Sequence, residues 1–342
     1  MSCLCLENPP GQAMVVKVGA HAPFLAALQE SSVSSNCNHK LMAAVECIVC
    51  DCPIAQQAFD SREVFAALSC TASRSTSATT HEEVCRVMTA LIRGRGSASN
   101  VWCDVEALND CIRATCSRVQ PCSCEAAAEL LDCLAAEMDE RVAQLLHARG
   151  DLTVAVDCIA TSASSHWCRV ALLSAVYRLI RLATDFRSSL RCCSLVATAH
   201  AAMSSAEDDL ECGVIANAIG ELVRGHAANK AAFSCEATCV GLKAMAEAAV
   251  EQATVQVVGF SRAFFSLRLH LSLQDIAFAV SSLYCCSSTT PMHRSAATSA
   301  ALLCLYVPSP CNAPLPHRFN SLLKLSDRCC RAGCAAALRT PQ

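Results

Sequence analysis

Apolar residues recur along this chain with the spacing of helices that have one buried side. The segment 209–224 shows the pattern well, because apolar side chains follow Ile215 at i+3, i+4, i+7 and i+8. That stripe is typical of an amphipathic α-helix. Gly225 follows it, and a residue that adopts positive φ at little cost commonly ends a helix. The pattern therefore predicts a helix from about Asp209 to Arg224.

Two further helices are predicted directly after this one. A short helix is expected to begin near Asn229 and to direct Ala232 and Phe233 inward. A longer helix is expected from about Thr238, with an apolar stripe formed by Val240, Leu242, Met245 and Ala248. Three helices of this size cannot bury their apolar faces alone, so the unit predicts neighbours of the same shape.

The rest of the chain shows the same succession of short and long helical segments. Thr80 with Glu83, and Ser205 with Asp208, are spaced as helix-capping pairs. Strand patterns are scarce, because alternating runs of β-branched and aromatic residues are rare. The expected helices cover residues 40–50, 53–61, 62–71, 80–93, 106–119, 125–137, 139–148, 151–163, 166–183, 186–192, 194–203, 251–271, 273–286 and 293–306.

The longest helix of each predicted unit supplies one position that marks the repeat. The seven marks are spaced by 43, 43, 45, 43, 45 and 38 residues, and they fall at Cys47, Ala90, Cys133, Arg178, Glu221, Ser266 and Cys304. The residue two before each mark and the residue after it are apolar in every case. A generic helical bundle need not hold such a spacing, so the pattern favours structural repeats.

The repeated unit resembles an armadillo repeat. The sequence Asn229-Lys230-Ala231-Ala232-Phe233 is similar to the start of that family's short first helix, and Val18-Gly19-Ala20 with Pro23-Phe24-Leu25 is similar to its turn and second helix. The resemblance implies an all-α fold, a right-handed α-solenoid of about seven three-helix repeats with a period near 43 residues. HEAT repeats, which have two helices per unit, are the near alternative.

The resemblance also implies a concave groove lined by the third helices. Import adaptors of the armadillo family hold peptides there with Trp and Asn side chains, but this chain has neither at the matching positions. The expected groove is of mixed charge instead and binds a protein or peptide partner. Its candidate residues are Arg86, Glu129, Arg178, Asn217, Glu221 and Arg262. They are expected to be at least partly exposed and to form one continuous row.

Domain limits follow from where the repetition begins and ends. Residues 1–13 show no periodicity and are expected to be a flexible leader. Residues 14–327 carry the repeats, and residues 328–342 are expected to form a frayed tail.

Composition and charge restrict the function further. The formal net charge of −3 provides no basic field for nucleic acid. No stretch of 18 or more apolar residues occurs, so no membrane span is expected. The chain has 28 cysteines and no signal peptide at its start, which favours reduced thiols acting as small core residues. A cytoplasmic, reducing location is therefore expected, with cytoskeletal or nuclear association as an alternative.

Sequence patterns for chemistry are weak. Cys47 and Cys50 have CxxC spacing near Cys52, but no second ligand pair follows at the distance of a zinc finger. Cys329, Cys330 and Cys334 lie downstream of His317 and are the other candidates for metal or redox chemistry. No Ser/His/Asp pattern and no phosphate-binding loop is evident. We therefore expect no catalytic residue, no metal and no cofactor.

The patterns together predict a non-enzymatic helical-repeat scaffold that binds a protein or peptide partner on its concave surface. One alternative is a structural subunit or fragment of a larger assembly. Another is a thiol- or metal-dependent protein that uses its cysteine clusters. The sequence does not identify the partner, and it leaves the oligomeric state open.

Overall fold

The computed structural model describes residues 8–29, 35–75, 77–94, 105–116, 123–190, 192–206 and 208–251. All of them belong to the first of the two units into which the chain divides, Met1–Arg294 and Ser295–Gln342. This described part is all-α, and it contains sixteen helices and no strand. No helix in it has both the length and the apolar content needed to cross a bilayer. The helices are α2 (Pro9–Lys17), α3 (Ala22–Gln29), α4 (Ser35–Val49), α5 (Pro53–Phe59), α6 (Arg62–Arg74), α7 (Ala78–Ile92), α8 (Val105–Cys116), α9 (Cys124–Glu137), α10 (Glu140–Arg149), α11 (Asp151–Ser162), α12 (His166–Leu182), α13 (Phe186–Ser189), α14 (Cys192–Met203), α15 (Asp209–Val223), α16 (Ala227–Phe233) and α17 (Glu236–Glu251).

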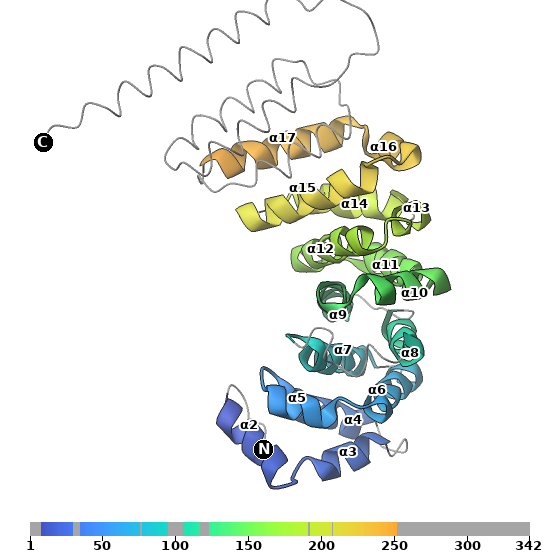
Figure 1. The fold of residues 1–342 in the computed structure, drawn as a ribbon. Coiled ribbons are helices and arrows are strands. Elements are labelled where there is room, and N and C mark those ends of the chain that lie inside the picture. Colours follow the sequence, from blue (N-terminus) through green and yellow to red (C-terminus); the bar gives the residue numbers. More distant parts are fainter. Residues whose placement is uncertain are drawn as a thin grey trace, which may run out of the picture. The chain divides into compact units, whose positions relative to one another are not determined.

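The helices pack in two series that follow the order of the chain (Figure 1). We call α4, α7, α9, α12 and α15 the long-helix series, because each packs against the next along the chain. A second series, formed by α3, α6, α8, α11, α14 and α17, packs in the same way. The long helices end at Val49, Ile92, Glu137, Leu182 and Val223, which are 43, 45, 45 and 41 residues apart.

The core lies along the long-helix series, at the apolar positions that flank the predicted repeat marks. On each long helix, the residue two before the mark and the residue after it are at most 1% exposed. The predicted inward face of these helices is therefore confirmed at the five marks from Cys47 to Glu221. The buried pairs are Val45 and Ile48, Met88 and Leu91, Leu131 and Leu134, Val176 and Leu179, and Ile219 and Leu222.

Glycine ends two helices where the sequence predicts it. Gly225 follows α15 with a φ of 68°, and Gly150 separates α10 from α11 with a φ of 82°. Side chains with a Cβ atom are strained in this left-handed region. The two breaks are therefore fixed locally, by the residue that the chain carries there.

Both predicted capping pairs are wrong in detail. Ser77 caps α7 by accepting the N–H of Thr80, so Thr80 lies inside the helix. Asp208 caps α15 by accepting the N–H of Glu211, whereas Ser205 donates to the carbonyl of Ala201. Several Ser, Thr and Asp residues precede each helix, and sequence spacing alone does not show which one adopts the extended cap conformation.

The start of the chain also differs from the prediction. Residues 1–13 were expected to be a flexible leader, but α2 begins at Pro9. The side chain of Asn8 accepts the N–H of Gly11, and a proline in the first turn sacrifices no helical hydrogen bond. The helix α2 thus overlaps the segment that lacks hydrophobic periodicity.

Two predicted inward positions lie on the surface instead. Ala232 is exposed, and Val240 is 60% exposed, whereas Phe233, Leu242 and Met245 are buried as expected. The predicted helices after residue 251, the tail 328–342 and the cluster around Cys329 lie outside the described residues.

Candidate partner-binding surface

Equivalent positions on the long helices, about one turn before the repeat marks, reach solvent. We call Ala43, Arg86, Glu129, Ser174 and Asn217 the long-helix row, one residue from each of α4, α7, α9, α12 and α15. All five are exposed or half-exposed. Each lies four residues before the repeat mark of its helix, about one turn away. The packing order of the helices therefore places these five residues in sequence along one series.

The charged members of the row, and Arg178 at the repeat mark of α12, belong to ion pairs. Arg86 Nη2 lies 2.6 Å from Glu82 Oε1 on the same helix, and Glu129 Oε1 lies 2.6 Å from Nη2 of Arg93 on α7. Arg178 Nε lies 3.2 Å from Oδ1 of Asp132 on α9. These side chains are between one quarter and one half exposed, so each pair stabilises the fold by at most about 1 kcal/mol.

Glu221 does not match the expectation of an exposed groove residue. It is 6% exposed, and its carboxylate lies 3.3 Å from Nη2 of Arg187 and 3.0 Å from Nη2 of Arg224. Burial lowers the pKa of the Arg187 guanidinium. Removing one partner of such a pair leaves a buried charge, which is strongly destabilising. Glu221 therefore holds α13 and the end of α15 together. Arg262, the last predicted groove residue, lies outside the described residues.

An acidic pair lies near the row at the contact of α4 with α7. Burial raises the pKa of Glu46, and the neighbouring carboxyl of Glu83 raises it further. Arg86 acts in the opposite direction. Oε1 of Glu83 also lies 3.6 Å from Nδ1 of His39. Acidic and basic side chains thus lie close together here, so the surface carries charges of both signs.

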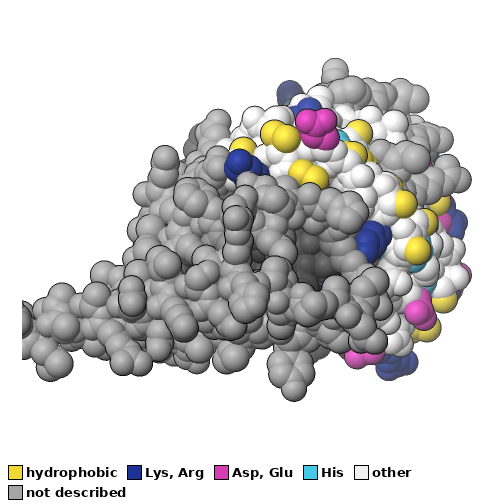
Figure 2. Space-filling view, turned by 90° about the horizontal axis from the view of Figure 1, so that it is seen from above, with side chains coloured by type: hydrophobic (Ala, Val, Ile, Leu, Met, Phe, Trp, Pro, Cys, Tyr) yellow, Lys and Arg dark blue, Asp and Glu magenta, His cyan; other side chains and the backbone are white. Residues whose placement is uncertain are grey.

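The space-filling view agrees with this mixed character. Where described residues are visible in Figure 2, basic, acidic and hydrophobic side chains are interspersed.

Buried amides join the short helices to the ends of the long ones, and the sequence analysis did not identify them. Gln12 Nε2 donates to the carbonyls of Cys47 and Cys50, at 2.8 Å each. Gln56 Nε2 donates to the carbonyl of Ala90 at 2.7 Å. The two glutamines are 44 residues apart, so their repeat spacing was the available signal. Each satisfies carbonyls that the end of a helix leaves without a partner.

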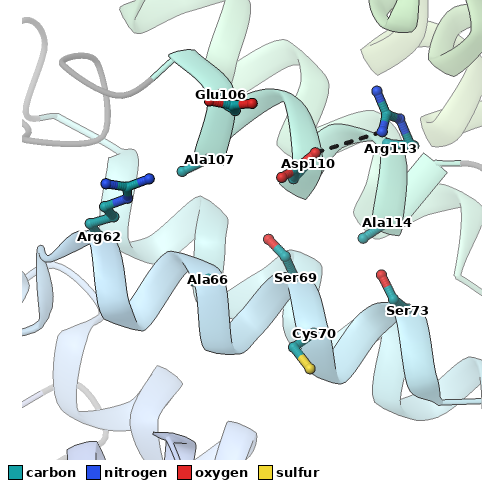
Figure 3. Close-up of a pocket in the computed structure, with 10 residues that line it drawn as sticks. All are labelled: Arg62, Ala66, Ser69, Cys70, Ser73, Glu106, Ala107, Asp110, Arg113 and Ala114. Carbon is teal, nitrogen blue, oxygen red and sulfur yellow. Dashed lines mark ion pairs between the residues drawn. The ribbon is translucent and has the colours of Figure 1, made fainter.

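A groove of about 500 Å³ lies between α6 and α8, in the second series (Figure 3). Arg62 and Glu106 lie toward one end of the groove, and Arg113 lies toward the other. Alanines at facing positions leave this space open, and the charges around it are again of both signs. The lining residues are Arg62, Ala66, Ser69, Cys70, Ser73, Glu106, Ala107, Asp110, Arg113 and Ala114.

The thiols in the CxxC segment have separate surroundings. Cys52 is buried before α5, while the pKa of Cys50 is raised by burial and by the adjacent Asp51. Among the described residues, no three His, Cys, Asp or Glu side chains have the arrangement of a metal site. Seven thiols are buried there: Cys52, Cys85, Cys111, Cys124, Cys133, Cys168 and Cys212.

A serine, a histidine and a glutamate also meet at the contact of α12, α14 and α15. Ser205 Oγ lies 2.7 Å from Nδ1 of His166, whose Nε2 lies 3.0 Å from Oε2 of Glu211. A hydrolase would also need backbone donors beside the serine to hold an oxyanion. Besides His166, the hydroxyl of Ser205 contacts the backbone carbonyls of Ala201 and Ala202, which suits a structural link between the helices.

Comparison with protein-family models, with curated proteins and with solved structures gives no match to this chain.

Proposed function

We propose that the chain is a non-enzymatic helical-repeat scaffold of the armadillo type that binds a protein or peptide partner through its long-helix series. The long-helix row supports this proposal most directly. Its five positions reach solvent at equivalent places on five successively packed helices, and apolar positions on either side of each repeat mark are buried. Such regularity serves a ligand that extends along several units.

We further propose that the fold is a right-handed α-solenoid of about seven armadillo-like repeats. We also propose that the protein works in a cytoplasmic, reducing environment. The three-helix succession of α5, α6 and α7, and of α10, α11 and α12, supports three helices per unit over two. The mixed charges of the row favour a partner with both acidic and basic side chains, and they disfavour nucleic acid.

Charge reversal tests the surface without disturbing the core. Arg86→Glu changes an exposed member of the row, and Arg178→Glu changes the exposed residue one turn after Ser174 of the row, to which it is hydrogen-bonded. The expected loss of stability is about 1 kcal/mol or less for each site. We expect the double variant to capture fewer partners from cells than the unsubstituted chain does, as measured by quantitative affinity capture.

A matched control has the same change of charge elsewhere. Arg141→Glu combined with Arg149→Glu alters two exposed residues of α10, outside the long-helix series. Equal capture by the unsubstituted chain and by both variants would remove the long-helix row as the binding site. Equal loss in both variants would indicate a dependence on net charge alone.

A further inference from the structure

A thiol, an imidazole and a hydroxyl meet where α17 begins. Cys235 Sγ lies 3.7 Å from Nε2 of His200, which is carried by α14. Oγ1 of Thr238 lies 2.7 Å from the same nitrogen and 3.3 Å from the sulfur. Cys235 and His200 are half-buried, whereas Thr238 is fully buried. The thiol therefore has a base beside it and one side toward solvent.

Cys235 also occupies the cap position of α17. Its carbonyl accepts the N–H of Cys239 at 3.2 Å, the first hydrogen bond of the helix. In α6, α7, α10, α12 and α15 the corresponding residue is Ser or Asp, whose side-chain oxygen accepts a backbone N–H. The positive end of the helix dipole stabilises an anion at this position, and a thiolate is such an anion.

Two other half-buried thiols, Cys158 and Cys239, have surroundings that disfavour the thiolate. Burial raises the pKa of Cys158, and the charge of Asp157 raises it further. Burial likewise raises the pKa of Cys239, one turn after Cys235, and the charge of Cys235 adds to that effect. At His200, burial lowers the pKa below its ordinary value of 6.5, so the imidazole is neutral near pH 7.

We propose that Cys235 is a nucleophilic modification site for soft carbon electrophiles of the α,β-unsaturated carbonyl class, with His200 as its proton carrier. The Cys235 thiol gives its proton to Nε2 of His200, and the sulfur forms a bond to the β-carbon of the electrophile. The π electron pair of the C=C bond moves toward the α-carbon, which then takes the proton back from His200. The addition needs no oxidant and releases no leaving group.

N-Ethylmaleimide, an α,β-unsaturated dicarbonyl, is a suitable probe for the full chain. The chain is first reduced and the reductant is removed; short pulses with the probe are then quenched. Peptide mapping by mass spectrometry gives a rate for each thiol. We expect Cys235 to react at least about threefold faster than the half-buried Cys70 and Cys158, because the imidazole of His200 lies beside its sulfur and can take up the proton as the bond forms. A rate at Cys235 no greater than that at Cys158 would overturn the proposal.

The variant His200→Gln tests the proton carrier. The amide can still bond to Thr238 but does not exchange a proton near pH 7, so the rate at Cys235 should fall by about threefold or more. The matched control His147→Gln changes a half-buried histidine on α10 and should leave that rate unchanged. An unchanged rate in His200→Gln would refute the role of His200.

The buried thiol of Cys111 reports whether the variant remains folded, because it should stay unreactive in the native chain. If His200→Gln exposes Cys111, the ranking of rates in the unsubstituted chain decides the proposal instead.

Discussion

The carboxyl of Glu46 on α4 illustrates how packing acts on one side chain. It is partly withdrawn from water and lies near the carboxyl of Glu83 on the neighbouring helix, and both effects raise its pKa above the ordinary value of 4.5. The folded chain therefore binds this proton more tightly than the unfolded chain does. The stabilisation is fully present below pH 4.5 and is lost as the pH rises through the raised pKa.

Replacing Glu46 with Gln removes this dependence on pH. We expect Glu46→Gln to be more stable relative to the unsubstituted chain at pH 7 than at pH 4, so that its free energy of unfolding minus that of the unsubstituted chain is larger at pH 7. Urea denaturation at both values measures the difference. Glu106→Gln makes the same chemical change at an exposed position on α8 and serves as the control. A flat difference for Glu46→Gln would show that the carboxyl is not held in its protonated form.

Leu131 on α9 represents the buried residues that flank the repeat marks. It is 1% exposed, so Leu131→Ala should leave a cavity and lower the free energy of unfolding by about 2–5 kcal/mol. The control Leu145→Ala removes the same atoms from an exposed position on α10, and its effect should be about 0.5 kcal/mol or less. Similar losses for both variants, measured by urea denaturation, would contradict the assignment of the inward face.

Many helix ends in the described structure are held by polar side chains. Side-chain oxygens cap the starts of α6, α7, α10, α12 and α15, and buried amides from α2 and α5 bind the carbonyls at the ends of α4 and α7. Backbone groups at a helix end have no partner within the helix, so a partner from elsewhere decides how firmly the end is held.

Gln56 allows a test with an adjacent control. Gln56→Ala deprives the carbonyl of Ala90 of a buried donor, and it should lower the free energy of unfolding by about 1–3 kcal/mol. Gln57→Ala changes the next residue, which is exposed, and should have a much smaller effect. Thermal or urea denaturation compares the two. Equal stability of both variants would indicate that water replaces the lost amide.

Across the described part of the chain, packing is mainly between helices that follow one another within each of the two series. α9 and α12 share the most extensive contact of any described helix pair, whereas α13 has only four residues. Local opening requires less free energy where fewer apolar contacts must be broken.

Hydrogen exchange of the native chain should follow this order. We expect backbone amides in the middle of α9 and α12 to exchange most slowly, and those of α13 to exchange much faster. Exchange followed by mass spectrometry of proteolytic fragments resolves the two regions. Uniform protection would contradict packing by neighbours alone and would indicate one globally cooperative unit.

Much of the helical architecture could be predicted from the sequence, because it depends on short-range patterns. The period near 43 residues, the buried positions on either side of the marks and the breaks at Gly150 and Gly225 follow from helical periodicity and from backbone sterics. The mixed charge of the long-helix row could also be anticipated, since Arg86, Glu129 and Asn217 occupy equivalent positions.

Only the tertiary structure decided which polar side chains meet. Glu221 has the spacing of a surface residue, yet Arg187, which lies 34 positions earlier, makes it part of a buried ion pair. His200 and Cys235 are 35 positions apart and share one site. A local pattern shows which side of a helix is apolar, but it contains no information about which polar group of another helix lies opposite. That choice depends on how successive helices pack, and packing sets the burial and the chemistry of each of these side chains.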